Sequence, residues 1–267
     1  MNIAFLSATG NRFALVDGFA GDWPDDPAAA ARELCQGGVL DGMLLVGRPV
    51  SGGACRMQVW NADGSRAEMC GNGMRCVGRF VVERGHVAAE EFDIESDVGR
   101  RAIKVLRKPN DQWSARVELG VPRHVETREI AVEAAGAMWR HSAVIVDLGN
   151  PHCVFFVDDP ATAPVAAVGT ALQSHAGFPH GTNVEFAAPS GHQLAMRVWE
   201  RGVGETASCG SGACAAALAA ILQGRVQSPV EVAIPGGWLL VERDDRGVLW
   251  LTGSIERIED PRLQVGV

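Results

Sequence analysis

An internal repeat constrains the fold of this chain more than any other feature of its sequence. The segment 57–73 aligns without a gap to the segment 196–212, and both follow the pattern M-x-V-W, nine residues, then C-G-x-G. Six of the seventeen aligned positions are identical, where unrelated segments of ordinary composition share about one. The identical pairs are Met57 and Met196, Val59 and Val198, Trp60 and Trp199, Cys70 and Cys209, Gly71 and Gly210, and Gly73 and Gly212. We therefore predict two related halves of similar fold.

The offset between the two copies is 139 residues, about half the length of the chain. We expect an N-terminal half at residues 1–130, which carries Cys70. The C-terminal half is expected at residues 131–267, and it carries Cys209. The junction should lie near the Ala-rich segment AVEAAGAMWRH, before residue 140. The last strand is free to cross back to the first half.

Each half has the same order of expected elements. An apolar strand ends at a Gly-Asn pair (Gly10-Asn11 and Gly149-Asn150), a strand ending in Val-Trp follows, and a Gly-rich loop leads into a helix that begins at the cysteine. The helices GMRCVGRFVVERG and GACAAALAAILQG are apolar at helical spacing and end at glycine. Shorter alternating strands come after them. We predict an α+β fold of two pseudo-symmetric domains, each a central apolar helix wrapped by mostly antiparallel β-sheet, with an active-site cleft between them.

The Cys-Gly-x-Gly unit at a helix start indicates a particular chemistry. The helix dipole stabilises a thiolate on Cys70 or Cys209, so we expect a lowered thiol pKa there. The glycines allow a substrate close to the backbone, and the first N–H groups of the helix can bind a carboxylate. A single copy would fit a buried structural cysteine equally well. Two copies facing one cleft would place an α-carbon between two sulfurs, one acting as base and the other as acid.

Other interpretations of the cysteines lack the necessary spacing. Cys76 and Cys214 follow the repeated cysteines by six and five residues, and neither pair forms the C-x-x-C of zinc or thioredoxin-type sites. We therefore predict no metal, and place Cys76 and Cys214 in the core. Cys153 adjoins His152, but neighbouring residues of a strand point to opposite faces, which argues against a nucleophile–base pair.

Composition excludes several function classes. The net charge of −8 argues against nucleic-acid binding, and no apolar run approaches the roughly 20 residues that span a membrane. The N-terminus lacks the features of a signal peptide, and the odd number of cysteines, seven, suits reduced thiols, so we expect a cytoplasmic protein. Pyridoxal phosphate needs a Schiff-base lysine. The only lysines, Lys104 and Lys108, lie outside any Gly-rich setting, and we expect no cofactor.

Four motifs resemble those of the diaminopimelate epimerase family: NADGSRAEMCGNGMRC, LGNPHC, GTNVEF and ERGVGETASCGSGACAAA. Together with Asn11 they extend over most of the chain. The resemblance implies two α/β domains with the site between them, usually in a homodimer. It also implies an isomerase that interconverts LL- and meso-diaminopimelate without a cofactor, in bacterial lysine and cell-wall precursor synthesis. The implied partner is a small amino-acid substrate, with no nucleic acid and no membrane.

The resemblance further implies roles for individual residues. The catalytic pair would be Cys70 and Cys209, the substrate-binding residues would be Asn11, Asn61, Gly71, Asn72, Asn150, Asn183, Glu200, Arg201, Gly210 and Ser211, and His152 would lie near the site. The backbone N–H groups of 71–72 and 210–211 would bind the reacting carboxylate. Arg201 would pair with the distal carboxylate, because a guanidinium makes two parallel bonds. Glu200 and the asparagine side chains would meet the distal ammonium group.

The opening segment departs from the family, which usually reads H-G-x-G-N-D-F. Here residues 7–13 read SATGNRF, so the asparagine remains while Arg12 replaces the aspartate. Two alternatives stay open: the same two-thiol reaction on histidine, proline or hydroxyproline, or a non-catalytic thiol protein that binds a ligand or senses redox state. Asn61, Asn183 and Arg201 favour a long substrate with a polar far end.

Overall fold

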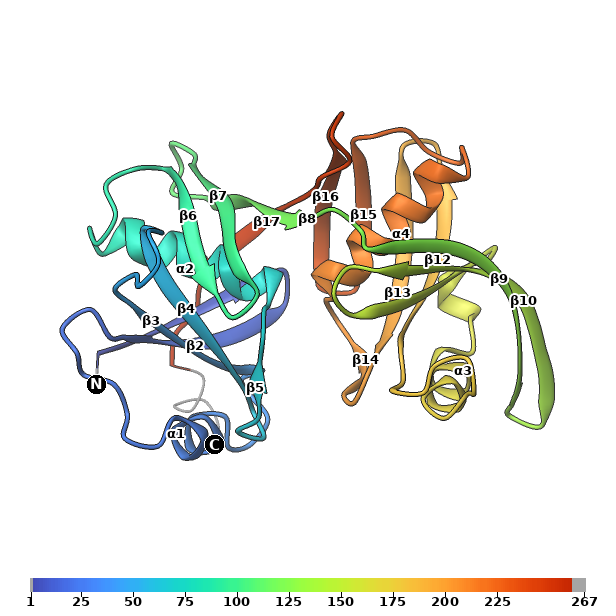
Figure 1. The fold of residues 1–267 in the computed structure, drawn as a ribbon, viewed down its shortest axis with the longest axis horizontal. Coiled ribbons are helices and arrows are strands. Elements are labelled where there is room, and N and C mark those ends of the chain that lie inside the picture. The colour runs from blue at the N-terminus through green and yellow to red at the C-terminus, as the bar shows by residue number, and fades with distance from the viewer. Residues whose placement is uncertain (1, 261–267) are drawn as a thin grey trace. The chain divides into compact units, whose positions relative to one another are not determined.

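The computed structural model describes residues 2–260, which form two compact units (Figure 1). The first unit contains the described residues up to Glu118 together with those from Thr252 onward. The second unit is the continuous stretch Leu119–Leu251. Within residues 2–260, none of the helices combines the length and the apolar character that crossing a bilayer requires.

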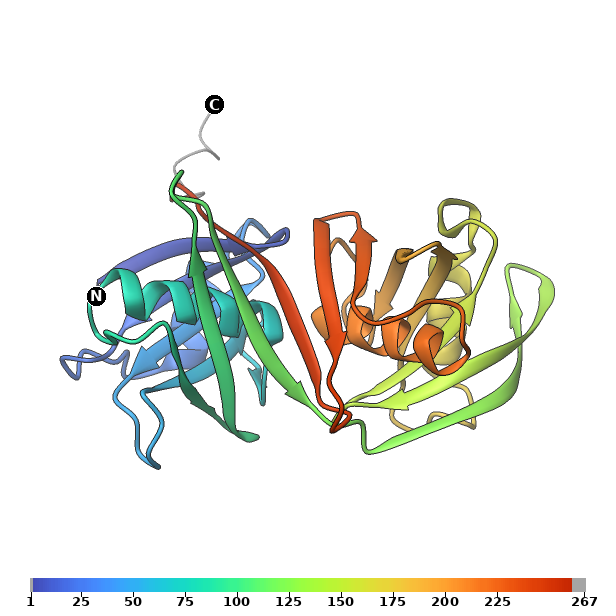
Figure 2. The same ribbon diagram turned by 90° about the horizontal axis from the view of Figure 1, so that it is seen from above.

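In the first unit the strands form a closed ring around one helix. The strands are β1 (Ile3–Ala8), β2 (Asn11–Asp17), β3 (Gly42–Gly47), β4 (Cys55–Asn61), β5 (Arg66–Ala67), β6 (Glu91–Ser96), β7 (Gly99–Arg107), β8 (Trp113–Gly120) and β17 (Leu249–Arg257). Pairing follows the order β1-β2-β3-β4-β6-β7-β8, and β17 closes the ring by pairing with β8 and β1. Figure 2 shows the red strand β17 beside the green strand β8. The enclosed helix is α2 (Gly71–Glu83), which is buried from Gly71 to Val81.

The second unit repeats this succession of strands. Its strands are β9 (His124–Ala134), β10 (Ala137–Asp147), β11 (Pro151–Phe156), β12 (Asn183–Ser190), β13 (Gln193–Glu200), β14 (Gly204–Thr206), β15 (Val230–Ile234) and β16 (Gly237–Arg243), with a short 3-10 helix at Pro160–Thr162. The order β10-β11-β12-β13-β15-β16 alternates antiparallel and parallel pairs as β1-β2-β3-β4-β6-β7 does. The central helix is α4 (Gly210–Leu222). The predicted α+β fold of two pseudo-symmetric domains is confirmed.

The two central helices begin and end where the repeat predicts. Each is followed by a glycine with positive φ, Gly85 at 72° and Gly224 at 66°, a conformation that ends helices and suits a residue without Cβ. In α4 the five alanines within 215–220 are all buried, so the strands can approach closely. In α2, Gly78 serves the same purpose, because a Cβ there would lie 2.4 Å from Ile103 Cδ1. The sheet thus encloses α4 as far as Ala220, whereas Leu222 at its C-terminal end is 52% exposed.

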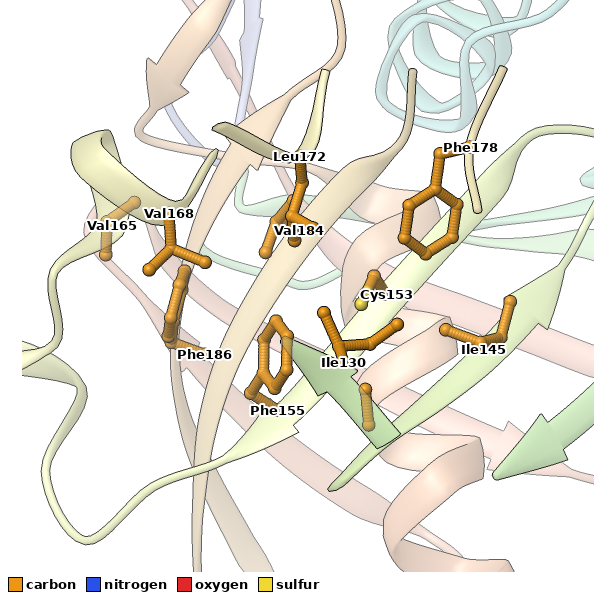
Figure 3. Close-up of a cluster of buried hydrophobic side chains, with 11 residues drawn as sticks. Ile130, Ile145, Cys153, Phe155, Val165, Val168, Leu172, Phe178, Val184 and Phe186 are labelled. Carbon is orange, nitrogen blue, oxygen red and sulfur yellow. The ribbon is translucent and has the colours of Figure 1, made fainter. Parts of the chain in front are cut away.

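Each unit also has a helix outside the sheet that the sequence analysis did not identify, α1 (Pro27–Leu34) and α3 (Val165–Leu172). With eight residues each, they are too short for a clear helical periodicity. α3 covers an apolar cluster centred on Phe155 (Figure 3), and α1 covers a corresponding cluster in the first unit. Trp199 and Trp60 pack against these two clusters. This shared role explains why the tryptophan belongs to the repeat.

The division between the units differs from the one expected from the sequence. The expected junction between residues 130 and 131 falls inside β9, which pairs along its whole length with β10 of the second unit. The Ala-rich segment forms the tight turn of this hairpin, where Ala135 and Gly136 both have positive φ. The junction was expected near this segment, but its backbone pairs across the hairpin and so belongs to strands β9 and β10. β17 begins in the second unit, and its residues from Thr252 belong to the first.

A buried carboxylate holds the loop that precedes β4. Glu95, in β6, is 3% exposed. Its carboxylate accepts hydrogen bonds from the backbone N–H groups of Val50, Ser51 and Gly53 at 2.7, 2.6 and 2.8 Å. Burial by itself would raise the pKa of Glu95, but these bonds favour the charged form and lower the pKa to about 2.

We expect Glu95→Gln to lower the free energy of unfolding near neutral pH by about 2 kcal/mol, because a neutral amide accepts weaker bonds than a carboxylate. The folded-state pKa lies below the ordinary value of 4.5, so the contribution of the carboxylate is complete above that value. It is lost as the pH falls toward 2. Urea unfolding of both proteins across this range measures the effect. A difference between them that did not shrink with acidity would contradict the assignment.

Candidate active site

Cys70 and Cys209 occupy equivalent positions at the N-termini of the central helices. Each is the N-cap residue with an extended backbone, φ −143° and ψ 113° for Cys70, φ −128° and ψ 106° for Cys209. The sulfur accepts the N–H of the glycine three residues later, at 3.3 Å from Gly73 and 3.4 Å from Gly212. Sulfur thus takes the place of the side-chain oxygen that usually caps a helix. The first helical residues are Gly71 and Asn72 in α2, and Gly210 and Ser211 in α4.

The surroundings of the two caps differ in one important respect. A Cβ on Gly73 would lie 3.1 Å from Leu44 Cδ2. At the equivalent place in the second unit, a Cβ on Gly212 would lie 2.8 Å from Glu185 Oε1. Leu44 and Glu185 therefore take corresponding positions on β3 and β12. The duplicated caps are alike in backbone, but one has an apolar neighbour and the other a carboxylate.

In the first unit, Asn11 and Asn72 lie together. Asn72 Nδ2 donates a hydrogen bond to Asn11 Oδ1, which joins the start of β2 to the first turn of α2. Asn61 lies at the end of β4 and is exposed. Its Nδ2 donates to Ser65 Oγ at 2.9 Å, within the following turn. The structure therefore brings together Asn11, Asn72 and the Cys70 cap, whereas the side-chain bond of Asn61 is made locally.

In the second unit, a buried histidine–glutamate pair lies behind Asn150. His152 Nδ1 is 2.6 Å from Glu185 Oε1, and both side chains are fully buried. His152 Nε2 is 3.2 Å from Asn150 Oδ1. β11 and β12 run parallel with His152 opposite Asn183, so residues 152 and 185 lie on the same face. Cys153 lies on the other face, in the cluster under α3, as the alternation of strand residues predicts.

The Cys209 thiol is buried among negative charges. Burial, followed by the charges of Glu200 and Glu185, raises the pKa of Cys209 well above its ordinary value. A hydrogen bond with Ser211, whose Oγ lies 3.6 Å from the sulfur, opposes this only partly. The expectation that the helix dipole would lower this pKa is wrong for Cys209, because burial and two carboxylates outweigh the dipole. Cys209 is therefore a neutral thiol near pH 7.

Glu200, Asn183 and Arg201 gather at the end of β13. Glu200 Oε1 accepts a hydrogen bond from Thr206 Oγ1 at 2.5 Å, and burial raises the pKa of the Glu200 carboxyl. Asn183 Oδ1 accepts the backbone N–H of Arg201 at 3.0 Å. Asn183 Nδ2 donates to the carbonyl oxygen of Pro151 at 2.9 Å. The Asn183 amide is thus held on both sides, while Arg201 is exposed.

Two buried charged residues beside these groups were not identified from the sequence. Glu185 follows Asn183 by two residues, and Arg75 follows Cys70 by five. Both are fully buried, although charged side chains seldom are unless they have a partner. The sequence did contain a sign of them, because each is a charged residue inside an expected apolar strand or helix. Each also lies within one of the four motifs described above.

Comparison with known sequences identifies the family of this chain. The sequence profile of the family described as diaminopimelate epimerase matches residues 3–125 and 144–258. The chain belongs to the diaminopimelate epimerase family. It is 40% identical to the diaminopimelate epimerase of Desulforudis audaxviator, over 97% of this chain and 98% of that protein. It is also 40% identical to the diaminopimelate epimerase of Moorella thermoacetica, over 91% of each chain. The resemblance seen in the motifs is confirmed, and so is the prediction of an isomerase.

Solved structures of low sequence identity share the fold of this family member. A phenazine biosynthesis protein of the PhzF family from Bacillus anthracis has a TM-score of 0.74 at 13% identity, over 96% of each chain. A hydroxyproline epimerase from Agrobacterium vitis, with bound trans-4-hydroxy-L-proline, has a TM-score of 0.66 at 15% identity. It matches 96% of this chain and 88% of that one. At these identities the likeness concerns the fold alone.

Proposed function

We propose that this protein interconverts LL- and meso-diaminopimelate, in lysine and cell-wall precursor synthesis, without a cofactor. The duplicated cap carries the proposal, because a cysteine sulfur stands at the start of each central helix with the same backbone geometry. Inversion of an α-carbon needs a base on one face and an acid on the other, and two thiols supply both. Membership in the diaminopimelate epimerase family supports the choice of substrate.

When the reaction starts with Cys209 as a neutral thiol, Cys70 acts as the base and Cys209 as the acid. The raised pKa of Cys209 supports this assignment. The Cys70 thiolate takes the α-proton and becomes a thiol, while negative charge spreads from the α-carbon into the adjoining carboxylate. Cys209 gives its proton to the opposite face and becomes the thiolate. The reverse reaction then uses Cys209 as base and Cys70 as acid.

The first turns of the central helices are proposed to hold the reacting carboxylate. The first N–H groups of an α-helix have no carbonyl partner within the helix, and those of 71–72 and 210–211 stabilise the charge that develops in the transition state. Arg201 binds the distal carboxylate and Glu200 the distal ammonium group. The remaining proposed substrate contacts are Asn11, Asn61, Asn150 and Asn183, with His152 directly behind Asn150.

We propose further that the protein acts in the cytoplasm as a homodimer. The odd number of cysteines and the net charge of −8 support a reducing compartment and a small-molecule partner rather than a nucleic acid. Among residues 2–260 no disulfide joins any of the seven cysteines, and both proposed catalytic thiols must be reduced to react.

A solvent-exchange assay tests reaction and substrate together. The reduced protein, incubated with LL-diaminopimelate in deuterium oxide, is expected to produce meso-diaminopimelate that carries deuterium at the inverted α-carbon. Histidine, proline and hydroxyproline serve as comparison substrates, and we expect neither exchange nor inversion with them. Absence of both exchange and inversion with diaminopimelate would refute the proposed function. Activity with one of the comparison amino acids instead would keep the mechanism and replace the substrate.

A further inference from the structure

We infer that Arg75 is a positioning residue that fixes the hydrogen-bonding direction of Asn11, so that Asn11 offers an N–H group to a carboxylate of the substrate. This role rests on the proposed function and adds to it a residue that does not itself touch the substrate. All the contacts that support it lie within the first unit.

Arg75 joins three segments of the first unit from a fully buried position in α2. Its Nη1 donates to Thr9 Oγ1 at 2.9 Å and to the carbonyl oxygen of Ser254 at 3.1 Å. Its Nη2 donates to Asn72 Oδ1. Thr9 belongs to the tight turn before β2 and has a φ of 50°, which is uncommon for a residue other than glycine. The guanidinium thus links that turn, β17 and the start of α2.

The chemistry of the guanidinium determines the orientation of both asparagines. Arg75 can only donate hydrogen bonds, so the atom of Asn72 that faces it must be the oxygen. The amide nitrogen of Asn72 then faces Asn11, and the oxygen of Asn11 must accept. Asn11 Nδ2 is left over, and no residue among 2–260 accepts a hydrogen bond from it. An amide N–H needs an acceptor, and the acceptors on the proposed substrate are its carboxylates. Asn11 is therefore assigned to a carboxylate, and not to the distal ammonium group that the resemblance implied for the asparagines.

The second unit shows that the fold does not require an arginine at this position. The offset of 139 residues aligns Arg75 with Cys214, which is buried in α4, and the same sheet forms around that helix. The asparagine equivalent to Asn11 is Asn150, whose oxygen lies 3.2 Å from His152 Nε2. In each unit a buried polar side chain therefore faces the oxygen of the equivalent asparagine. This side chain is Asn72 in the first unit and His152 in the second, and the two do not occupy equivalent positions.

Arg79 supplies a matched comparison on the same helix. It lies one turn beyond Arg75, is 5% exposed, and donates to the carbonyl oxygen of Ile255 in β17 at 3.0 Å. Its guanidinium also contacts Glu83 and the ring of Trp113. Both arginines therefore tie α2 to β17, but only Arg75 is bonded to Asn72.

The test compares Arg75→Lys with Arg79→Lys by steady-state kinetics and thermal unfolding. A lysine ammonium cannot span the three acceptors of Arg75, so we expect both variants to lose thermal stability, and only Arg75→Lys to raise KM for LL-diaminopimelate by about tenfold or more. Arg79→Lys should leave KM within about twofold of the wild type. Equal changes of KM in the two variants would overturn the positioning role.

Asn11→Asp tests the direction of the hydrogen bond itself. The aspartate can still accept from Asn72, but it presents an oxygen in place of Nδ2, and we expect KM to rise about 100-fold with a smaller change in kcat. L-Lysine, used as a competitive inhibitor, lacks the second carboxylate. Its inhibition constant rises with Asn11→Asp if Asn11 binds the reacting carboxylate, and stays unchanged if Asn11 binds the distal one.

Binding by Asn11→Asp as tight as by the wild type would overturn the inference, because it would mean that Asn11 meets the substrate with its oxygen. If Arg75→Lys does not fold, Asn72→Leu interrupts the same chain of hydrogen bonds at its middle, and the same rise in KM is expected. Lack of epimerase activity in the wild-type protein would refute the proposed function instead, and the wild-type assay reveals this before any variant is compared.

Discussion

Replacement of either repeated cysteine by alanine is expected to reduce kcat for epimerisation by about 10³-fold or more. Exchange of the α-proton with solvent should persist, but with only one of the two epimers as substrate. Without Cys209, the Cys70 thiolate can still remove the α-proton on its own face and return deuterium from solvent to that face. Deuterium then enters one epimer with retention of configuration. Without Cys70, it enters the other epimer. Mass spectrometry and NMR of each pure epimer in deuterium oxide measure this difference.

Cys76→Ala and Cys214→Ala are the matched controls, since both thiols are buried in the same two helices as the repeated cysteines. They are expected to leave kcat within about twofold and to cost about 1 kcal/mol of stability through lost packing. Equal exchange from both epimers in a variant that retains only one of Cys70 and Cys209 would contradict the assignment of one thiol to each face.

Glu185→Ala is expected to lower the free energy of unfolding by about 3 kcal/mol, the upper end of the usual cost when a buried hydrogen-bonding group loses its partner. The change leaves His152 Nδ1 without its acceptor at a place where both side chains are fully buried. It also removes one of the two negative charges that raise the pKa of Cys209. The pH at which the Cys209 thiol becomes reactive toward iodoacetamide should therefore fall. Urea unfolding and alkylation at a series of pH values measure the two effects.

Glu231→Ala is the control for this change. Glu231 lies on β15 of the same unit, is exposed, and accepts a hydrogen bond from Gln193, so its loss should alter neither stability nor the alkylation of Cys209 appreciably. If Glu185→Ala were as well tolerated as Glu231→Ala, Glu185 would not be the partner on which His152 depends.

The parts of the site that lie close together in the sequence were predictable. A cysteine followed by Gly-x-Gly and an apolar segment predicts the start of a helix from local sequence alone. Both caps form where the repeat places them. The pairing of His152 with Glu185 is different in kind. It depends on the register of β11 against β12, two strands whose paired residues His152 and Asn183 are separated by α3 in the chain. No local pattern contains that register.

The pKa of Cys209 illustrates the same limit in electrostatics. The helix dipole is a local feature and can be read from the motif, but Glu200 and Glu185 reach the thiol only through the folding of β12 and β13 around α4. Burial, which raises this pKa most, depends on the same folding. The helix N-terminus alone therefore predicted the wrong direction for the pKa of Cys209, because burial and two carboxylates from elsewhere in the unit outweigh the dipole.

The border strands of the two units have a consequence for the duplication itself. β9 follows the strands of the first unit in the chain but pairs with β10, and β17 follows the strands of the second unit but pairs with β1. Neither repeat completes its sheet with its own last strand. Two separate copies of one repeat would meet this need by swapping strands, as domain-swapped homodimers do. Within a single polypeptide the two repeats are covalently linked, so pairing of the last strand of one repeat with the other repeat no longer depends on the protein concentration.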